Sequence, residues 1–339
     1  MSPLRVSVGG EPRELKTVWL DGNVVRMIDQ RALPFELRVL EARNPDEVAR
    51  AIESMAVRGA PAIGATAAYG LALAEAQGLN LERVALRLRM TRPTGHDLFA
   101  AIDYVLGRVR DGGTAREAAE AYARDDEERC LAIGRHGKRL IKEGTRILTH
   151  CNAGALATVD HGTVLAPMRA ARAAGVDFFV YVSETRPRLQ GSRLTAWELQ
   201  QEGIDHAIVV DSACGLLMQR GEVDLVLVGA DRIAANGDTA NKIGTYPKAV
   251  VAKASRVPFY VAAPMTTVDW GARSGRSIPI EERDDMEVLT VNGARVAPEG
   301  SRARNFAFDV TPARCITGFV TDKGVLTPAE LRALRPKRK

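Results

Sequence analysis

The chain has 339 residues, of which 46% are hydrophobic and 26% charged, a composition typical of a soluble globular protein with one or two domains. It has no apolar run long enough to span a bilayer and no apolar signal-peptide core at its start, so we expect a cytoplasmic protein without a membrane partner. The net charge of +5 comes from interspersed basic residues and a terminal RPKRK cluster, which argues against nucleic-acid binding.

The first 143 residues are predicted to form a mainly helical domain. Apolar segments interrupted by Asp21-Gly22 and by a Leu-Pro pair indicate a short β-meander over residues 17–39. Asn44 is suited to cap a helix that begins at Pro45, because apolar residues then recur at helical spacing. Further helices are predicted over residues 64–77, 81–90, 98–109 and 115–141.

Residues 144–339 are predicted to form a second domain of the α/β class. Helical segments at 166–174 and 194–201 alternate with short apolar runs that indicate buried strands, at 146–149, 178–182, 207–210, 225–228 and 259–262. This alternation is typical of βαβ units and a parallel sheet. We therefore expect ligands to bind at the carboxyl ends of these strands.

Two of these strand ends carry candidate catalytic residues. Cys151 directly follows the strand at 146–149 and precedes Asn152; most buried cysteines are inert, but one at a strand end is a candidate catalytic thiol. His150 is not expected to serve it as a base, because neighbouring side chains on a strand face opposite ways. Asp231 follows the strand at 225–228 and Gly229, where the backbone can approach a ligand closely.

The segments 183–191 and 228–246 also offer polar side chains for binding. Asn241 and Lys242 precede a predicted helix, whose first amides would complete an anion site; the alternative is a surface lysine–aspartate pair. Arg186 is suited either to a phosphate or to a structural pair with Glu184. Gln190 is suited to sugar hydroxyls, although glutamines are common on surfaces.

A fourth segment, in the helical half, is predicted to hold a phosphate. Pro61 suits the first turn of a helix, so Arg58, Gly59 and Ala60 would present a guanidinium and backbone amides at its start. Arg92 offers a second guanidinium at a break between two helices. Either arginine alone is equally consistent with a simple capping role.

No metal or cofactor is expected. The four cysteines are far apart and fit neither a zinc site nor a disulfide scaffold, so free thiols in a reducing compartment are expected. No Gly-x-Gly-x-x-Gly motif follows a predicted strand, so a nicotinamide cofactor is not indicated.

Taken together, these motifs resemble the methylthioribose-1-phosphate isomerase family. The resemblance rests on IDQRALPFEL (28–37), MAVRGAPAIGATAAYGLALA (55–74), HCNAGALAT (150–158), ETRPRLQGSRLTAWEL (184–199) and GADRIAANGDTANKIGTY (229–246), in the family's order. It implies a mainly helical N-terminal domain with a small β-meander, a Rossmann-like parallel-sheet domain, and a homodimer.

The resemblance also implies an activity: aldose–ketose isomerisation of 5-methylthioribose 1-phosphate to 5-methylthioribulose 1-phosphate in methionine salvage. It makes Cys151 and Asp231 the catalytic pair. With phosphate on C1 an acid must protonate the ring oxygen, for which Asp231 is the candidate, and Cys151 is either a thiolate base or a group that polarises the C2 hydroxyl. Transfer of the hydrogen from C2 to C1 as a proton or as a hydride stays open. The implied substrate-binding residues are Arg58, Gly59, Ala60, Arg92, Gln190, Asn241 and Lys242.

One departure from the family concerns the far end of the sugar. After Arg92-Pro93-Thr94 the family usually continues Ala-Val-Asn, whereas this chain has Gly95-His96-Asp97. One hypothesis is that His96 faces the C5 substituent and that the substrate is 5-deoxyribose 1-phosphate or ribose 1,5-bisphosphate. The alternative is that these residues only reshape a helix start, with Asp97 as its cap.

A function without catalysis is the remaining alternative. Regulatory subunits of the eukaryotic initiation-factor-2B exchange complex share this fold and act by assembly. A purely binding descendant has no reason to keep the thiol, the aspartate and the phosphate cradle together. Because Cys151, Asp231 and Arg58 are all present, we favour the enzyme.

Overall fold

The computed structural model describes residues 4–8, 11–92 and 95–336. Pro93 and Thr94, which follow the candidate binding residue Arg92, lie outside these residues, as does the end of the basic C-terminal cluster. Within the described ranges no helix is both long and apolar enough to cross a membrane.

The N-terminal region contains two small antiparallel sheets. Strands β1 (Leu4–Val8) and β2 (Glu11–Leu15) form a hairpin. The predicted meander is confirmed as β3 (Val18–Asp21), β4 (Val24–Ile28) and β5 (Val39–Ala42). Its first turn contains Gly22, whose φ of 56° is a conformation that glycine adopts easily.

The helical half is built around a buried helix. The expected cap is present, because the Asn44 side chain accepts a hydrogen bond from the Glu47 amide at 2.9 Å. Helix α2 is buried along Ala62–Ala74 and packs against α4 and α5. The helices are α1 (Pro45–Glu53), α2 (Ala60–Ala76), α3 (Leu81–Arg89), α4 (His96–Arg110) and α5 (Ala115–Gly137), followed by the short 3-10 helix η1 (Lys138–Leu140).

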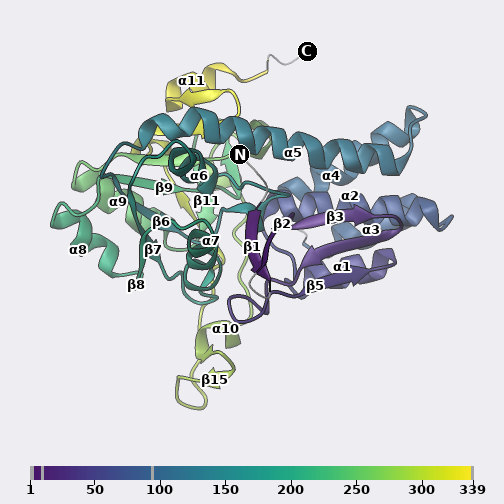
Figure 1. Cartoon of the computed structure of the whole chain (residues 1–339), viewed down its shortest axis with the longest axis horizontal. Coiled ribbons are helices and arrows are strands. Elements are labelled where there is room, and N and C mark those ends of the chain that lie inside the picture. Colours follow the sequence, from purple (N-terminus) through teal and green to yellow (C-terminus); the bar gives the residue numbers. More distant parts are fainter. Residues whose placement is uncertain (1–3, 9–10, 93–94, 337–339) are drawn as a thin grey trace.

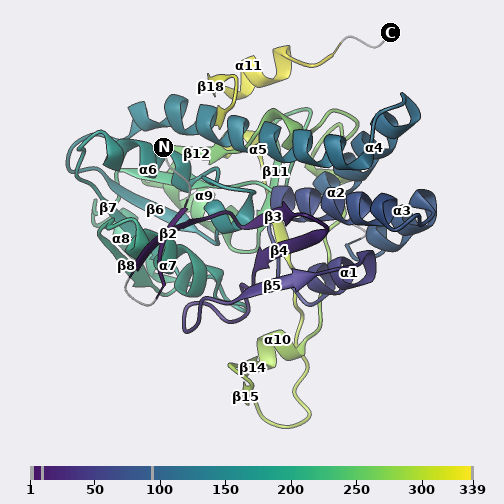
Figure 2. The same cartoon turned by 45° about the vertical axis from the view of Figure 1, so that its right-hand side comes forward.

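Helix α5 links the two halves of the molecule. It runs along one side of the structure, from the helical half to the large sheet (Figures 1 and 2). Its residue Ile133 belongs to the apolar core of the α/β half, whereas Ala119 and Ala123 belong to the core around α2. The two halves therefore share one rigid element.

The large sheet has seven strands in the order β18-β17-β12-β9-β6-β7-β8, and all but β18 are parallel. If the six parallel strands are numbered in chain order, they lie side by side as 6-5-4-1-2-3, the arrangement of a Rossmann-type sheet. This confirms the predicted fold class. The strands are β6 (Arg146–His150), β7 (Phe179–Ser183), β8 (His206–Val209), β9 (Leu225–Val228), β12 (Phe259–Ala262), β17 (Gly318–Thr321) and β18 (Gly324–Leu326).

Helices cover both faces of this sheet. One face packs residues of α6 (Leu165–Ala173) and α7 (Ala196–Gln201), and the other packs α8 (Ala213–Gln219) and α9 (Thr245–Ala254). The predicted helix at 194–201 begins as a π-helical turn, η3 (Gly191–Thr195). Helix α11 (Pro328–Ala333) follows β18. Short 3-10 turns complete the half: η2 (Ala155–Ala157), η4 (Met265–Thr267), η5 (Gly275–Ser277) and η6 (Ala313–Cys315).

A four-stranded sheet that the sequence patterns did not predict stands beside the large one. Its order is β13-β10-β11-β16, with bounds β10 (Arg232–Ala234), β11 (Thr239–Lys242), β13 (Val268–Asp269) and β16 (Phe308–Thr311). Residues 228–246 are therefore mostly a β-hairpin and not the expected long loop. Strands of two to four residues are too short to show an alternating pattern.

The chain also makes an excursion between residues 281 and 308. It contains α10 (Met286–Leu289), β14 (Thr290–Val291) and β15 (Ala294–Arg295), and it projects from the body in both views (Figures 1 and 2). The Arg188 side chain pairs with Glu287 at 2.6 Å at its base. Both of its ends return to the cavity described next.

Candidate active site

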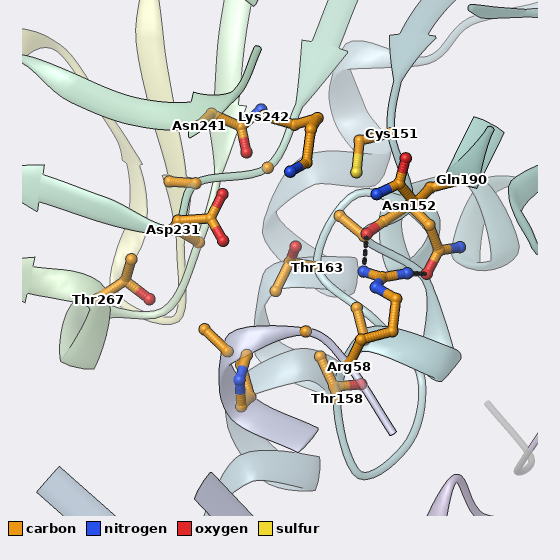
Figure 3. A pocket seen from close by; sticks show the side chains of 18 of the residues that line it. Arg58, Cys151, Asn152, Thr158, Thr163, Gln190, Asp231, Asn241, Lys242 and Thr267 are labelled. Atoms are coloured by element: carbon orange, nitrogen blue, oxygen red, sulfur yellow. Dashed lines mark hydrogen bonds between the residues drawn. The ribbon is translucent and has the colours of Figure 1, made fainter. Parts of the chain in front are cut away.

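A cavity lies where the strand order of the large sheet reverses, between β6 and β9. The space in and around it that no atom fills, part of which is open to solvent, is about 760 Å³. Figure 3 shows side chains from both halves of the chain pointing into it. All nine predicted site residues line it: Arg58, Gly59, Ala60, Arg92, Cys151, Gln190, Asp231, Asn241 and Lys242.

Cys151 is held in place through its backbone. It follows the last residue of β6 and has a φ of 64°, a backbone angle that residues other than glycine rarely adopt. Its amide donates to Thr185 Oγ1 at 2.8 Å, and its carbonyl accepts from Thr195 Oγ1 at 2.6 Å. These two bonds hold the strained turn, so the thiol faces the cavity (Figure 3).

Behind the thiol, a buried carboxylate organises the same loop. Glu198 on α7 accepts hydrogen bonds from Asn152 Nδ2 at 2.7 Å and from the Ala155 amide at 2.7 Å. A side chain at Gly154 would collide with this carboxylate, so the loop can approach it only with glycine there. Burial raises the pKa of Glu198 to about 7 despite these bonds. No sequence pattern linked Glu198 to the site.

The start of α2 contacts this loop directly. Arg58 donates to Asn152 Oδ1 and to the Asn152 carbonyl, both at 2.8 Å (Figure 3). Gly59 has a φ of 93°, and a Cβ there would collide with the Ala157 carbonyl. Among the described residues, no side chain caps this helix start. Its amides and the Arg58 guanidinium thus border the cavity with positive potential, as the sequence predicted.

Asp231 lies across the cavity from Cys151, and in Figure 3 the Lys242 side chain projects between them. Burial raises the pKa of Asp231, and the nearby Lys242 and Arg58 only partly offset this effect. Burial and the neighbouring Arg283 lower the pKa of Lys242 to about 8. The Lys242 amine donates to the Ala307 carbonyl at 2.9 Å and lies over the Phe308 ring. Burial also lowers the pKa of Arg92.

Two buried amides complete the polar lining. Gln190 is 6% exposed, and its Oε1 has no hydrogen-bond partner among the described residues, so it is available to a ligand hydroxyl. Asn241 lies on β11 and donates to Thr245 Oγ1 at 2.9 Å. Its position on a strand corrects the expectation that Asn241 and Lys242 belong to a loop.

The expected anion site at the start of α9 is already filled. Asp309 accepts hydrogen bonds from the Gly244 amide at 2.7 Å and the Tyr246 amide at 3.0 Å. This carboxylate takes the place that the prediction gave to a substrate. The prediction failed because Asp309 lies more than 60 residues further along the chain.

Two other candidates have structural partners. Arg186 donates to the carbonyls of Pro187 and Val288, and no pair between Arg186 and Glu184 is found among the described residues. His150 Nε2 lies 2.8 Å from the Ile243 carbonyl, and burial lowers its pKa to about 3. The neutral His150 ring is thus bound to the backbone, in line with its exclusion as a base for Cys151.

A second cavity adjoins the first and shares Arg92 and Asp231 with it. His96 and Asp97 line this cavity, together with apolar residues such as Ile278. Among the described residues no side-chain cap bond is found at the start of α4, where the alternative gave Asp97 that role. Instead Asp97 is 2% exposed, and burial raises its pKa to about 7.

Several lining residues escaped the sequence prediction. Arg283 and Phe308 come from the two ends of the excursion, and Thr163 and Thr267 come from other turns. Arg283 stands next to acidic residues in the segment IEERDD, which looks like an ordinary solvated charge run. No group of three or more potential metal ligands is found in the described part of the chain.

Known proteins are similar to this chain in both fold and sequence. The initiation factor 2 subunit family matches residues 56–328. A methylthioribose-1-phosphate isomerase of Chloroflexus aurantiacus is 48% identical, and the match covers 95% of this chain and 98% of that protein.

Two solved structures extend the likeness. The 5-methylthioribose 1-phosphate isomerase of Pyrococcus horikoshii OT3 has a TM-score of 0.87 and 43% identity, covering 95% of each chain. The translation initiation factor eIF-2B subunit delta of A. fulgidus has a TM-score of 0.83 and 42% identity, covering 94% of this chain and 100% of that one. The chain therefore belongs to the initiation factor 2 subunit family and, within it, to the methylthioribose-1-phosphate isomerase family.

Proposed function

We propose that this protein converts 5-methylthioribose 1-phosphate to 5-methylthioribulose 1-phosphate, an isomerisation in methionine salvage. The convergence of a thiol, a protonatable carboxyl and an arginine-backed helix start on one cavity carries this proposal. An aldose–ketose isomerisation of a sugar phosphate needs acid–base groups and a phosphate site. The names of the relatives support the same activity.

Ring opening is the first chemical requirement. With phosphate on C1 the ring does not open spontaneously to an aldehyde, so an acid must protonate the ring oxygen as the C1–O bond breaks. We assign this step to Asp231. Burial raises the pKa of its carboxyl and so favours the protonated form that the step consumes.

The second requirement is transfer of hydrogen from C2 to C1. Either a proton moves through an enolate or a hydride shifts directly, and in both routes the C2 hydroxyl loses its proton to become the ketone. We assign this loss to Cys151, whose thiol faces the cavity from the end of β6 (Figure 3). Its anchored backbone fixes the distance from sulfur to substrate.

We assign the phosphate to the start of α2, with Arg58, Gly59 and Ala60 as its first ligands and Arg92 and Lys242 as further cations. Arg58 already uses two donors on Asn152, and a guanidinium has five, so three remain for a ligand.

We assign the binding of the sugar hydroxyls to the side chains of Gln190 and Asn241. The unpartnered Gln190 Oε1 supports this assignment.

Turnover by the purified protein tests the proposal. Isomerisation of 5-methylthioribose 1-phosphate should be followed by NMR, with 5-deoxyribose 1-phosphate and ribose 1,5-bisphosphate as comparison substrates. Conversion of at least one sugar is expected. Failure on all three would reject the enzyme and favour the assembly role of the initiation-factor regulatory subunits.

The second cavity favours a specific substrate alternative. It adjoins the first cavity at Arg92 and is lined by His96. We propose that the C5 substituent enters this cavity, where His96 would contact an oxygen-rich group. Higher kcat/KM for ribose 1,5-bisphosphate supports this substrate; a hundredfold preference for the methylthio sugar contradicts it.

We also propose a homodimer. Strand β8 ends the described sheet, and apolar side chains on or beside it are exposed: Ile208 is 50%, Val210 56% and Leu216 47% exposed. Burial of such a patch against a second copy would remove it from water. Light scattering should give a dimer mass, and Leu216→Lys should yield monomers; a monomeric wild type would contradict the proposal.

A cytoplasmic location and a division into domains 1–143 and 144–339 are also proposed. All four cysteines are free, as is usual in a reducing compartment. Residues 142–144 form an exposed turn before β6. Limited proteolysis should cut this turn first, and cleavage within α5 or β6 would argue against the boundary.

A further inference from the structure

A half-buried carboxylate outside the cavity is used by no step of the proposed reaction. Asp211 lies between β8 and α8, at the carboxyl end of the large sheet. In the part of the chain that the structure describes, it lines neither of the two cavities. Its role must therefore be sought in the groups that it holds.

Three donors from the end of β7 converge on the Asp211 carboxylate. Ser183 Oγ and the Thr185 amide donate to Oδ1, the amide over 3.0 Å, and the Arg186 amide donates to Oδ2 over 2.8 Å. Burial raises the pKa of this carboxyl, but the bonds from Ser183 and the Arg186 amide, together with the Lys248 ammonium, outweigh burial and bring the pKa below its ordinary value. An ionised carboxylate thus fixes the turn that follows β7.

The same turn holds the backbone of the thiol. Thr185 is fully buried and has a φ of 68°, which a β-branched residue rarely adopts, so its conformation needs outside support. Its hydroxyl donates to the Ser183 carbonyl at 2.9 Å and accepts a hydrogen bond from the Cys151 amide at 2.8 Å. Because a hydroxyl has a single proton, the Cys151 amide meets an oxygen that is already oriented to accept.

A nearby histidine does not turn these groups into a proton relay. His150 Nε2 lies 2.8 Å from the Ile243 carbonyl, which can only accept, so Nε2 carries the proton of the neutral ring. The other ring nitrogen, Nδ1, lies 3.7 Å from Asp211 Oδ1 and has no proton to share with it. The proton of the ring thus points to the backbone and not to the thiol.

We propose that Asp211 is a positioning residue for Cys151 and acts through Thr185. The carboxylate holds the Thr185 backbone, and the Thr185 hydroxyl holds the Cys151 amide. This inference rests on the proposed function, in which the thiol must lie at a fixed distance from the C2 hydroxyl. A displacement of about 1 Å at the sulfur is enough to lower turnover by about 100-fold.

Asp211→Asn tests the first contact. An amide has one oxygen, so its NH2 group would face either the Arg186 amide or the Ser183 and Thr185 donors. We expect kcat to fall about 10- to 100-fold, with KM within about threefold of the wild type, because the groups assigned to the phosphate and hydroxyls stay in place. Asp205→Asn makes the same change at an exposed position just before β8 and should leave both constants unchanged.

A matched pair of variants at Thr185 tests the second contact. Thr185→Val keeps the shape of the side chain but removes the acceptor of the Cys151 amide, so kcat should again fall about 10- to 100-fold. Thr185→Ser keeps the hydroxyl and should stay within about threefold of the wild type. Recovery by serine separates the hydrogen bond from the packing of the side chain. If Asp211→Asn does not fold, as judged by circular dichroism, this pair decides alone.

A second measurement needs no substrate. Mass spectrometry of the peptide that contains Cys151 gives the rate at which iodoacetamide alkylates this thiol. Thr185→Val and Asp211→Asn should change that rate constant by at least about threefold, whereas Thr185→Ser and Asp205→Asn should stay within about twofold of the wild type.

Two results would overturn the proposal. If Thr185→Val keeps both kcat and the alkylation rate within the limits set for Thr185→Ser, the hydroxyl does not position the thiol. If both Thr185 variants lose kcat, KM and melting temperature together, the residue serves general stability. A wild-type protein that converts none of the three sugars would instead refute the proposed function, and the alkylation rates would still decide whether Asp211 and Thr185 position Cys151.

Discussion

The two sides of the cavity hold their functional groups by different means. On the thiol side, hydrogen bonds from Thr185 and Thr195 fix the Cys151 backbone, and Glu198 fixes the loop behind it. On the carboxyl side, burial raises the pKa of Asp231 and lowers that of Lys242. The first side controls position, whereas the second controls protonation.

Two buried carboxyl groups, those of Glu198 and Asp97, also differ in how they are held. Burial raises the pKa of both Glu198 and Asp97 to about 7. Glu198 accepts hydrogen bonds from three N–H groups, but Asp97 Oδ1 has no partner among the described residues. Glu198 is therefore expected to anchor its loop through these hydrogen bonds, whereas Asp97 Oδ1 has no such bond in the described chain to compensate for its burial.

The largest effect is expected when the reacting group of either side is removed. Asp231→Asn and Cys151→Ser should each lower kcat by at least about 1,000-fold, because each removes a proton-transfer group that the reaction requires. Steady-state assays should be paired with melting curves to exclude unfolding. Cys315→Ser and Asp111→Asn, outside the cavity, are the controls. A kcat within tenfold of wild type would remove that residue from the mechanism.

A smaller effect is expected from the anchor on the thiol side. Glu198→Gln replaces an acceptor of three N–H groups with an amide that has one oxygen, so one buried donor loses its partner at a cost of about 1–3 kcal/mol. We expect kcat/KM to fall about 10- to 100-fold, since Asn152 and Arg58 shift with the loop. Gln200→Ala, exposed on the same helix, is the control. An unchanged KM and melting temperature would contradict the anchoring role.

On the carboxyl side, Asp97→Asn should change stability with pH. The folded-state pKa of Asp97, about 7, exceeds the ordinary 3.8, so its burial costs stability progressively as pH rises from about 4 to above 7. The variant lacks this cost. Urea unfolding should measure the difference in free energy of unfolding between the variant and the wild type. This difference should shift in favour of the variant by on the order of 2 kcal/mol between pH 5 and pH 8. If the free energies of unfolding of the variant and the wild type change in parallel with pH, burial does not oppose the ionisation of Asp97.

The smallest effect is expected at the rim of the second cavity. His96→Val restores the family's residue and removes a polar group near Arg92. We expect the ratio of kcat/KM for ribose 1,5-bisphosphate over the methylthio sugar to fall by a few fold, with kcat on the methylthio sugar little changed. An unchanged ratio would show that the C5 substituent does not reach His96.

Sequence patterns predicted the reacting group on each side of the cavity. Cys151 and Asp231 both follow strands long enough to show apolar runs, and the switch point of a parallel sheet brings such strand ends together. The start of α2 was predictable because Pro61 marks a first turn. These signals are local, within a few residues of the group that they place.

The contacts that complete each side come from distant parts of the chain. Glu198 meets Asn152 across 46 residues, and Lys242 meets the Ala307 carbonyl across 65. The four-stranded sheet that carries Lys242 has strands of only two to four residues, too short for a periodic pattern. Arg283 lies in an acidic run whose charges look solvated until the excursion folds back over the cavity.

The carboxylate of Asp309 makes the two helix starts near the cavity unequal. Asp309 occupies the amides at the start of α9, whereas no side chain of the described residues caps the start of α2, which lines the cavity. Unpaired amides at a helix start attract negative charge. A built-in anion thus neutralises one helix start and leaves the other to set the electrostatic polarity of the cavity.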